Sequence, residues 1–360
     1  MKKPPKSRPE PKLKSKYSGR PILKRVAAGL AVLVAVPVLV IAGLWLWAGG
    51  QKTPPQDIVW GYTYSSYMTK EELGLDSQPV YLAALDELKP KIVRLVAYWQ
   101  YLQPTADSWD FSDLDFQVAE AEKRGIPYII AVGNRVPRYP ECFTPAWAKD
   151  LSGQQRQAAV LRLVETVVRR YDGGRHLLRW QVENEPYLGL FGICPPLDED
   201  LLKKEVALVR SLSSKDILIT DSGELSTWYQ ASGLGDVFGT TMYRKVYDKT
   251  NGKVFRHIIP AEFYTRRANL MKKLHPGLKQ VVNAELQAEP WADAPLSQKD
   301  EAFYNKTLDH QQFKDNIEFA QATGLEEVYL WGVEWWYLRK LQGDSFYWDN
   351  AKALFNQSAR

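Results

Sequence analysis

The sequence contains few of the residues that bind metals. Two cysteines, Cys142 and Cys194, and four histidines are spread over 360 residues. Neither type recurs at the short spacings of a zinc site. We therefore expect no metal site and no cofactor. The histidines are His176, His257, His275 and His310.

Most of the chain also lacks the positive charge that nucleic-acid binding requires. The formal net charge is +5, but residues 1–25 carry ten Lys or Arg and a single acidic residue, Glu10. The rest of the chain is therefore slightly acidic, and we expect no nucleic acid as a partner. The chain does not lack hydrophobic residues. With 45% apolar and 12% aromatic residues, it has the composition of a folded, enzyme-sized protein rather than a disordered one.

A glycine-rich phosphate loop is missing after the first strand-like run, which argues against a doubly wound open sheet. Eight short apolar runs do occur, with helical periodicity between many of them. The apolar runs begin at residues 57, 91, 127, 177, 216, 236, 280 and 327, and helical segments begin at 110, 154, 198, 260 and 299. This alternation predicts an α/β protein in which residues 57–360 form one (β/α)₈ TIM barrel.

An uncharged run precedes this domain. Residues 26–47 read VAAGLAVLVAVPVLVIAGLWLW and would be about 33 Å long as a helix, enough to cross a bilayer. Trp45 and Trp47 stand where interfacial aromatic residues are expected. The run therefore predicts a single transmembrane helix embedded in a lipid bilayer.

The basic residues in front of the run predict its orientation. They place residues 1–25 in the cytoplasm as a disordered tail and the domain outside it. We thus expect a single-pass protein of the cell membrane, with residues 48–56 as a linker. A cleaved signal peptide is the alternative, with small residues at 48–50 as the cleavage site. The apolar run is longer than the usual signal core and favours an uncleaved anchor.

The active site of a (β/α)₈ barrel lies at the carboxyl ends of its strands. Two of the predicted strand ends, facing each other across the barrel, carry Glu185 and Glu285. Such a pair of carboxylates is required for glycoside hydrolysis, where one protonates the leaving oxygen and the other attacks or activates water. The ends of the predicted strands also carry Arg94, Trp99, Asn184, Tyr243 and Trp331.

In these residues the sequence resembles glycoside hydrolase clan A, the retaining (β/α)₈ enzymes. The matching motifs are Asn184-Glu185-Pro186, Glu285 in VVNAELQAEPW, Arg94 in IVRLVAYW, Tyr243 in TTMYR and Trp331 in YLWGVEWW. The resemblance implies that Glu185, after strand four, is the general acid/base. It implies that Glu285, on strand seven, is the nucleophile.

The same resemblance implies roles in substrate binding. Asn184 would donate to the 2-hydroxyl of the sugar, Arg94 and Tyr243 would keep Glu285 ionised, and Trp331 would be the floor on which the sugar stacks. The cellulase and mannanase branch of the clan has His two residues before the tyrosine, where this chain has Thr241. That branch also has His near the end of strand three, which AVGNRV lacks. The motif QVENE is instead similar to β-galactosidases of the clan.

Two other glutamates compete for these roles. Glu289 is an alternative nucleophile, and Glu183 is an alternative acid because strand alternation places it on the same face as Glu185. Alternation also places Asn184 on the opposite face, so a site that uses both Asn184 and Glu185 needs a distorted strand end. Five tryptophans after predicted strands are either sugar platforms or loop packing. They are Trp147, Trp228, Trp291, Trp335 and Trp336.

The two cysteines follow neighbouring predicted strands on the catalytic side of the barrel. Outside the cytoplasm a disulfide persists, so we expect Cys142 and Cys194 to join the loops after strands three and four.

Together these features predict a retaining glycoside hydrolase that acts on a β-linked oligosaccharide or polysaccharide by double displacement. A transglycosylase that builds an envelope polymer is an alternative. An inactive barrel that only binds sugar is another.

Overall fold

The structure is a computed structural model that describes residue 1 and residues 20–50, 57–248, 250–292 and 295–357. The chain forms two compact units, Met1–Trp47 and Ala48–Arg360. Most of the predicted tail and of the predicted linker lies outside the described residues.

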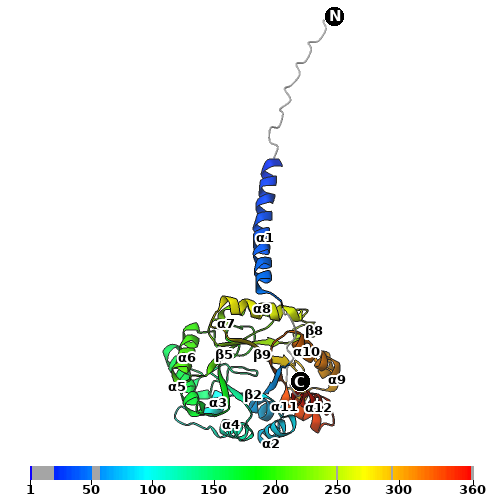
Figure 1. Cartoon of the computed structure of the whole chain (residues 1–360). Coiled ribbons are helices and arrows are strands. Elements are labelled where there is room, and N and C mark those ends of the chain that lie inside the picture. Colours follow the sequence, from blue (N-terminus) through cyan, green and yellow to red (C-terminus); the bar gives the residue numbers. More distant parts are fainter. Residues whose placement is uncertain (2–19, 51–56, 249, 293–294, 358–360) are drawn as a thin grey trace. The chain divides into compact units, whose positions relative to one another are not determined.

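The predicted anchor, residues 26–47, falls within one helix, α1 (Arg20–Ala48) (Figure 1). In the part of the chain that the structure describes, no helix is both long enough and apolar enough to cross a membrane. The span predicted from the sequence is therefore not supported by the structure.

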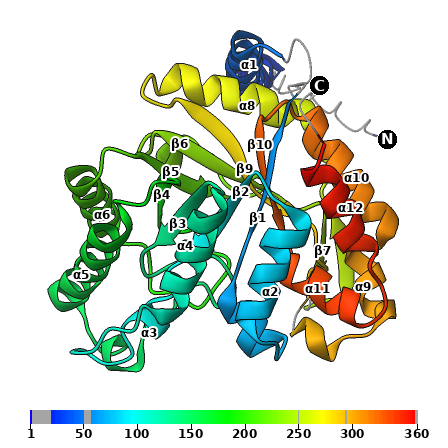
Figure 2. The same cartoon turned by 60° about the horizontal axis from the view of Figure 1, so that its bottom comes forward.

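The second unit is built on a closed barrel of eight parallel strands, as predicted. Around the barrel the strands follow the order β1, β10, β9, β6, β5, β4, β3, β2. Figure 2 shows these strands at the centre with helices around them. The strands are β1 (Val59–Thr63), β2 (Ile92–Val96), β3 (Tyr128–Val132), β4 (Leu177–Val182), β5 (Asp216–Asp221), β6 (Val237–Met242), β9 (Gln280–Gln287) and β10 (Glu327–Trp331).

The strands form here because both of their faces are covered. Every residue of β2 and β3 is buried, which is the pattern of a parallel sheet with helices outside and side chains inside. Six strands contribute to an apolar cluster that is separate from the main core, and we assign it to the barrel interior. Its residues are Ile92, Ile129, Leu218, Val237, Val282 and Tyr329.

The helices follow the strands and close the outer layer. The helices of this unit are α2 (Ser77–Ala83), α3 (Trp99–Leu102), α4 (Ser112–Arg124), α5 (Gly153–Tyr171), α6 (Glu199–Leu212), α7 (Tyr229–Ser232), α8 (Ala261–Leu274), α9 (Glu301–Thr307), α10 (His310–Ala322), α11 (Val333–Leu341) and α12 (Phe346–Phe355). Shorter π and 3-10 turns are η1 (Met68–Glu72), η2 (Ala84–Leu88), η3 (Ala146–Ala148) and η4 (Leu296–Gln298).

Two details differ from the sequence prediction. The helical segment that begins at 299 is divided into α9 and α10, because the Asp309 side chain accepts from Gln312 N at 2.7 Å and caps a new helix. An antiparallel hairpin, β7 (Lys245–Asp248) and β8 (Lys253–Arg256), follows β6 and was not predicted.

Candidate active site

Glu285 on β9 is held between a cation and a phenol. Arg94 Nη1 on β2 donates to Glu285 Oε1 at 3.0 Å, and the Tyr243 hydroxyl after β6 donates to Oε2 at 2.8 Å. The glutamate is almost fully buried. Burial and Glu285 itself raise the pKa of Tyr243, so the phenol keeps its proton and remains a donor. Both carboxyl oxygens of Glu285 are therefore held by charge-assisted or phenolic hydrogen bonds.

Arg94 joins Glu285 to the end of β4. Its side chain is fully buried, and its guanidinium also donates to Gln181 Oε1 and to Asn184 Oδ1, each at 2.7 Å. A buried guanidinium needs such partners because it has no water to replace them. Gln181 was not identified from the sequence, although it belongs to the QVENE motif.

The end of β4 has the distortion that a site with both Asn184 and Glu185 requires. After Val182 the backbone takes positive φ at Glu183 (54°) and Glu185 (43°), which non-glycine residues rarely adopt. Strand alternation therefore ends here. Asn184 points to Arg94, while Glu185 lies near β6.

Glu185 has surroundings opposite to those of Glu285. Its backbone N–H donates to Thr220 Oγ1 at 2.9 Å, and Thr241 Oγ1 lies 3.4 Å from its Oε1. Among the described residues, no Lys, Arg or His lies within ion-pair distance of its carboxyl. Burial, followed by the negative charges of Glu285 and other carboxylates, raises the pKa of Glu185 well above its usual range. Glu185 therefore retains a proton where an ordinary carboxyl has lost it.

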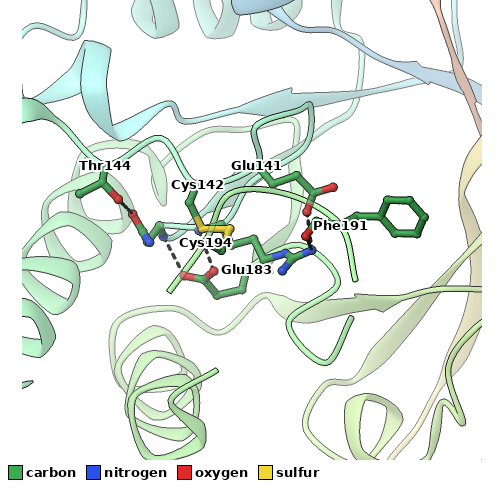
Figure 3. The surroundings of a disulfide bond; sticks show 8 residues. Glu141, Cys142, Thr144, Glu183, Phe191 and Cys194 are labelled. Atoms are coloured by element: carbon green, nitrogen blue, oxygen red, sulfur yellow. Dashed lines mark hydrogen bonds and ion pairs between the residues drawn. A yellow bond between two sulfur atoms is a disulfide. The ribbon is translucent and has the colours of Figure 1, made fainter. Parts of the chain in front are cut away.

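Glu183, the alternative acid, is occupied elsewhere. Its carboxyl oxygens accept from the backbone N–H groups of Asn134 and Arg135, each at 2.7 Å (Figure 3). The Glu183 carboxyl can lie this close to the loop because residue 133 is glycine, since a Cβ there would be 2.3 Å from Glu183 Oε1. Glu183 thus fixes the start of the loop after β3.

Glu289, the alternative nucleophile, is also occupied. It forms a buried ion pair with Arg138, and Arg138 in turn pairs with Glu334 at 2.7 Å. The same guanidinium lies over the Trp331 ring, 4.2 Å from its centroid. Trp331 is only 8% exposed, so one face of the predicted sugar platform is covered by Arg138.

The other tryptophans separate into core and site residues. Three are fully buried core residues, namely Trp228, Trp335 and Trp336. The Trp147 indole donates to Gln103 O and packs edge-on against Trp99. Trp291 is half-buried and packs edge-on against Tyr243, with ring centroids 5.0 Å apart. Of the five candidates, Trp291 is therefore the one whose ring contacts a partner of Glu285.

The predicted disulfide is present. Cys142 and Cys194 are bonded, with Cα atoms 5.2 Å apart, and they join the loop after β3 to the loop after β4 (Figure 3). Next to Cys142 stands Glu141, which pairs with Arg135 at 2.7 Å. Burial raises the pKa of Glu141 to about 7, and Glu285 contributes to this shift. Glu141 is therefore a further carboxylate whose charge acts on the two glutamates of the site.

Sequence reasoning missed the charged residues of the loop after β3, which are Arg135, Arg138 and Glu141. The segment NRVPRYPEC carried a signal, since three charges among prolines beside a cysteine are unusual in a solvated loop. In the described part of the chain no group of three or more His, Cys, Asp or Glu is arranged to hold a metal ion.

No family model and no curated protein sequence matches the chain. Solved structures do match, and three of those with TM-scores above 0.5 are glycoside hydrolases. A GH5_18 enzyme from Bifidobacterium longum, in complex with Manβ1-4GlcNAc, is 14% identical over 76% of this chain and 68% of its own, with a TM-score of 0.54. A GH5_18 enzyme from Streptomyces cattleya, in complex with GlcNAc, is 15% identical over 76% and 70%, with a TM-score of 0.52.

A GH113 β-1,4-mannanase is 11% identical over 84% of this chain and its whole length, with a TM-score of 0.51. The chain covers about half, 52%, of a β-galactosidase from Halorubrum lacusprofundi. The three likenesses with TM-scores above 0.5 confirm that the fold is a (β/α)₈ barrel. At these identities they are likenesses of fold.

Proposed function

We propose that the chain is a retaining glycosidase that acts on a β-linked glycan. One observation carries the proposal, namely that Glu185 and Glu285 stand at strand ends with opposite surroundings. Glu285 is held by Arg94 and Tyr243, whereas the pKa of Glu185 is raised by burial and by neighbouring carboxylates. A carboxyl with a raised pKa, beside a second carboxyl that a cation and a phenol hold, is what an acid and a nucleophile require.

The reaction has two steps. In the first, a Glu285 oxygen attacks the anomeric carbon, the bond from this carbon to the leaving oxygen breaks, and Glu185 gives its proton to that oxygen. In the second, Glu185 removes a proton from water, which displaces Glu285 and releases the sugar with its original anomeric configuration. Asn184, fixed by Arg94, would bind the 2-hydroxyl of the sugar, and Trp331 would contact its ring.

Substitution of the two glutamates tests the proposal. Glu285→Gln should abolish turnover of aryl β-glycosides. The Glu185→Ala variant should carry out the first step only with leaving groups that need no proton. Added azide should then replace water in the second step of this variant and yield a glycosyl azide. Glu262→Gln, on the exposed surface of α8, is the control and should retain full activity.

The outcomes separate the alternatives. An active Glu285→Gln variant contradicts the assignment of the nucleophile. A first product with inverted configuration, observed by NMR, contradicts the retaining mechanism. Transfer of the sugar to an added acceptor in preference to water would indicate a transglycosylase, and binding without turnover would indicate an inactive barrel.

Attachment to a membrane is a further part of this proposal. The uncharged run at residues 26–47 and the basic residues before it support it. The active site would then face outside the cytoplasm, where the Cys142–Cys194 bond is stable.

A further inference from the structure

Two loops next to Glu185 expose large apolar side chains. Tyr139, after β3, is 63% exposed, and Leu190, Phe191 and Ile193, after β4, are 76%, 40% and 68% exposed. We call these four residues the apolar rim. Clustered exposed apolar side chains cost solvation free energy and mark binding surfaces on soluble domains.

The apolar rim is held in place, so its exposure is not that of a free loop. The Cys142–Cys194 bond joins the two loops, and Ile193 N donates to Pro140 O at 2.9 Å. Gly192 lies so close to the other loop that a Cβ there would be 3.0 Å from Pro140 O. The two loops therefore present one fixed apolar surface.

This surface is continuous with the proposed reaction centre. The Phe191 ring packs edge-on against Trp291 at 5.6 Å, and Trp291 packs against Tyr243, which donates to Glu285. The Phe191 carbonyl accepts from Arg135 at 3.1 Å (Figure 3). An unbroken series of aromatic contacts thus leads from the proposed nucleophile to the apolar rim.

The apolar rim also lies on the side of the proposed acid. The loop that carries Leu190 and Ile193 begins directly after Glu185, and the leaving oxygen must lie beside Glu185 to receive its proton. Groups attached to that oxygen will therefore extend over these loops. Leu190, Phe191 and Ile193 have no side-chain hydrogen-bonding group, so a sugar in this place would lose hydration of its hydroxyls without replacement.

We propose that the apolar rim binds an apolar aglycone, so that the substrate is a β-glycoside of a hydrophobic alcohol rather than a chain of sugars on both sides of the bond. This inference rests on the proposed function. The reaction is balanced by one water: the glycosidic bond breaks, the Glu185 proton passes to the oxygen of the alcohol, and water supplies the new hydroxyl of the sugar.

Chain-length dependence tests the inference. The full chain, solubilised in a detergent that contains no sugar, is assayed with methyl, butyl, hexyl and octyl β-glycosides of one sugar, each below its micellar concentration. Each fully buried methylene raises kcat/KM by about fourfold, so we expect at least about a tenfold rise from methyl to octyl. The double variant Leu190→Ser/Ile193→Ser should reduce the octyl-to-methyl ratio toward one.

A matched control is Leu341→Ser, since Leu341 at the end of α11 is also exposed. It should leave the octyl-to-methyl ratio unchanged. Thermal unfolding and an intact disulfide show that each variant is folded.

Three results would overturn the inference. The first is an octyl-to-methyl ratio near one in an active enzyme, which leaves the proposed function standing. The second is that the unmodified protein is a dimer and the double variant a monomer, while the two have the same octyl-to-methyl ratio. The third is binding to phosphatidylcholine vesicles that the double variant abolishes while the ratio stays unchanged. Absence of hydrolysis with every glycoside, including aryl glycosides, contradicts the proposed function itself.

Discussion

Glu141 is the residue through which the loop after β3 can act on the proposed acid. Its negative charge is one of those that raise the pKa of Glu185, whereas Arg135, its partner, lowers that pKa. Glu141→Gln removes the negative charge and leaves Arg135 unneutralised. Both changes lower the pKa of Glu185.

Glu185 must be protonated to act as an acid, so the basic limb of the kcat/KM profile reports its pKa. We expect this limb to move to lower pH in Glu141→Gln. Profiles of the variant and of Glu262→Gln with one aryl glycoside provide the measurement. An unmoved limb, or one shifted to higher pH, contradicts the interpretation.

Tyr243 makes a single contact with Glu285, which a conservative change removes. Tyr243→Phe deletes the hydroxyl 2.8 Å from Glu285 Oε2 and keeps the ring against Trp291. A hydrogen bond to a charged group contributes about 1.5–3 kcal/mol, so kcat/KM should fall by about 10- to 100-fold. Steady-state kinetics and a thermal-unfolding control measure this, and an unchanged kcat/KM would remove Tyr243 from the proposed site.

At this scale the sequence identified residue types better than their orientation. Arg94, Asn184, Tyr243 and Glu285 do meet, because motifs at strand ends converge in a barrel. The alternation rule could not separate Glu183 from Glu185, since both take positive φ. What separates them is contact with residues distant in sequence, such as the Asn134 and Arg135 amides that hold Glu183. No local pattern encodes such contacts.

Secondary structure elements were predictable where burial is continuous. The eight barrel strands are apolar runs covered on both faces, and all eight were recognised. The hairpin of β7 and β8 was missed because every residue of β8 is exposed, so no apolar pattern marks it. The break between α9 and α10 depends on one cap, Asp309, within an otherwise helical segment.

Helix α6 contributes a buried carboxyl that links it to the end of β4. Glu205 on α6 is 1% exposed and faces Glu183. Burial and Glu183 raise the pKa of Glu205 well above its usual value near 4.5. The folded state therefore keeps a proton that the unfolded state releases, and stability falls as pH rises from about 4.5 toward the raised pKa, by at most about 1.4 kcal/mol per pH unit.

Glu205→Gln should remove this dependence because the amide is neutral and can donate at every pH. We expect the variant to be at least as stable as the unmodified protein at pH 5, with a difference in its favour that grows toward pH 8. Denaturant unfolding across this range measures it, with Glu262→Gln as the control. A variant that loses stability at every pH would show that Glu205 is needed in its charged form.

The disulfide should stabilise the two loops beside the site. Its cysteines are 52 residues apart, and closing a loop of this length stabilises by about 4 kcal/mol on a chain-entropy estimate. Cys142→Ser/Cys194→Ser should therefore lower the free energy of unfolding by up to about that amount. Urea unfolding with and without reductant measures the effect. Two reactive thiols in the unreduced, denatured protein, or unfolding that is insensitive to reductant, would contradict the bond.

At the scale of the whole molecule, the barrel supplies the framework, and in our proposal its loops supply the specificity. Its strands hold Arg94 and Glu285, whereas the apolar rim and Glu141 belong to the loops joined by the disulfide. The similarity to solved structures at 11–15% identity therefore shows only that the barrel framework is shared. The substrate must be determined from residues of this chain.

The last prediction concerns residues 26–47, for which the sequence predicts a membrane anchor. If the prediction holds, the full chain stays in the membrane fraction after a carbonate wash. Protease added to intact cells then degrades residues 57–360 and leaves a short protected fragment.

A substitution tests the same run of residues. Leu33→Arg/Leu39→Arg places two charges in it, each of which costs about 2.5–3.5 kcal/mol in a bilayer, and this variant should be released from the membrane. Leu225→Arg, at an exposed position of the second unit, is the matched control and should not. A mature N-terminus near residue 51 would instead identify a cleaved signal peptide, and recovery of the uncleaved chain after the wash without membrane would contradict an anchor.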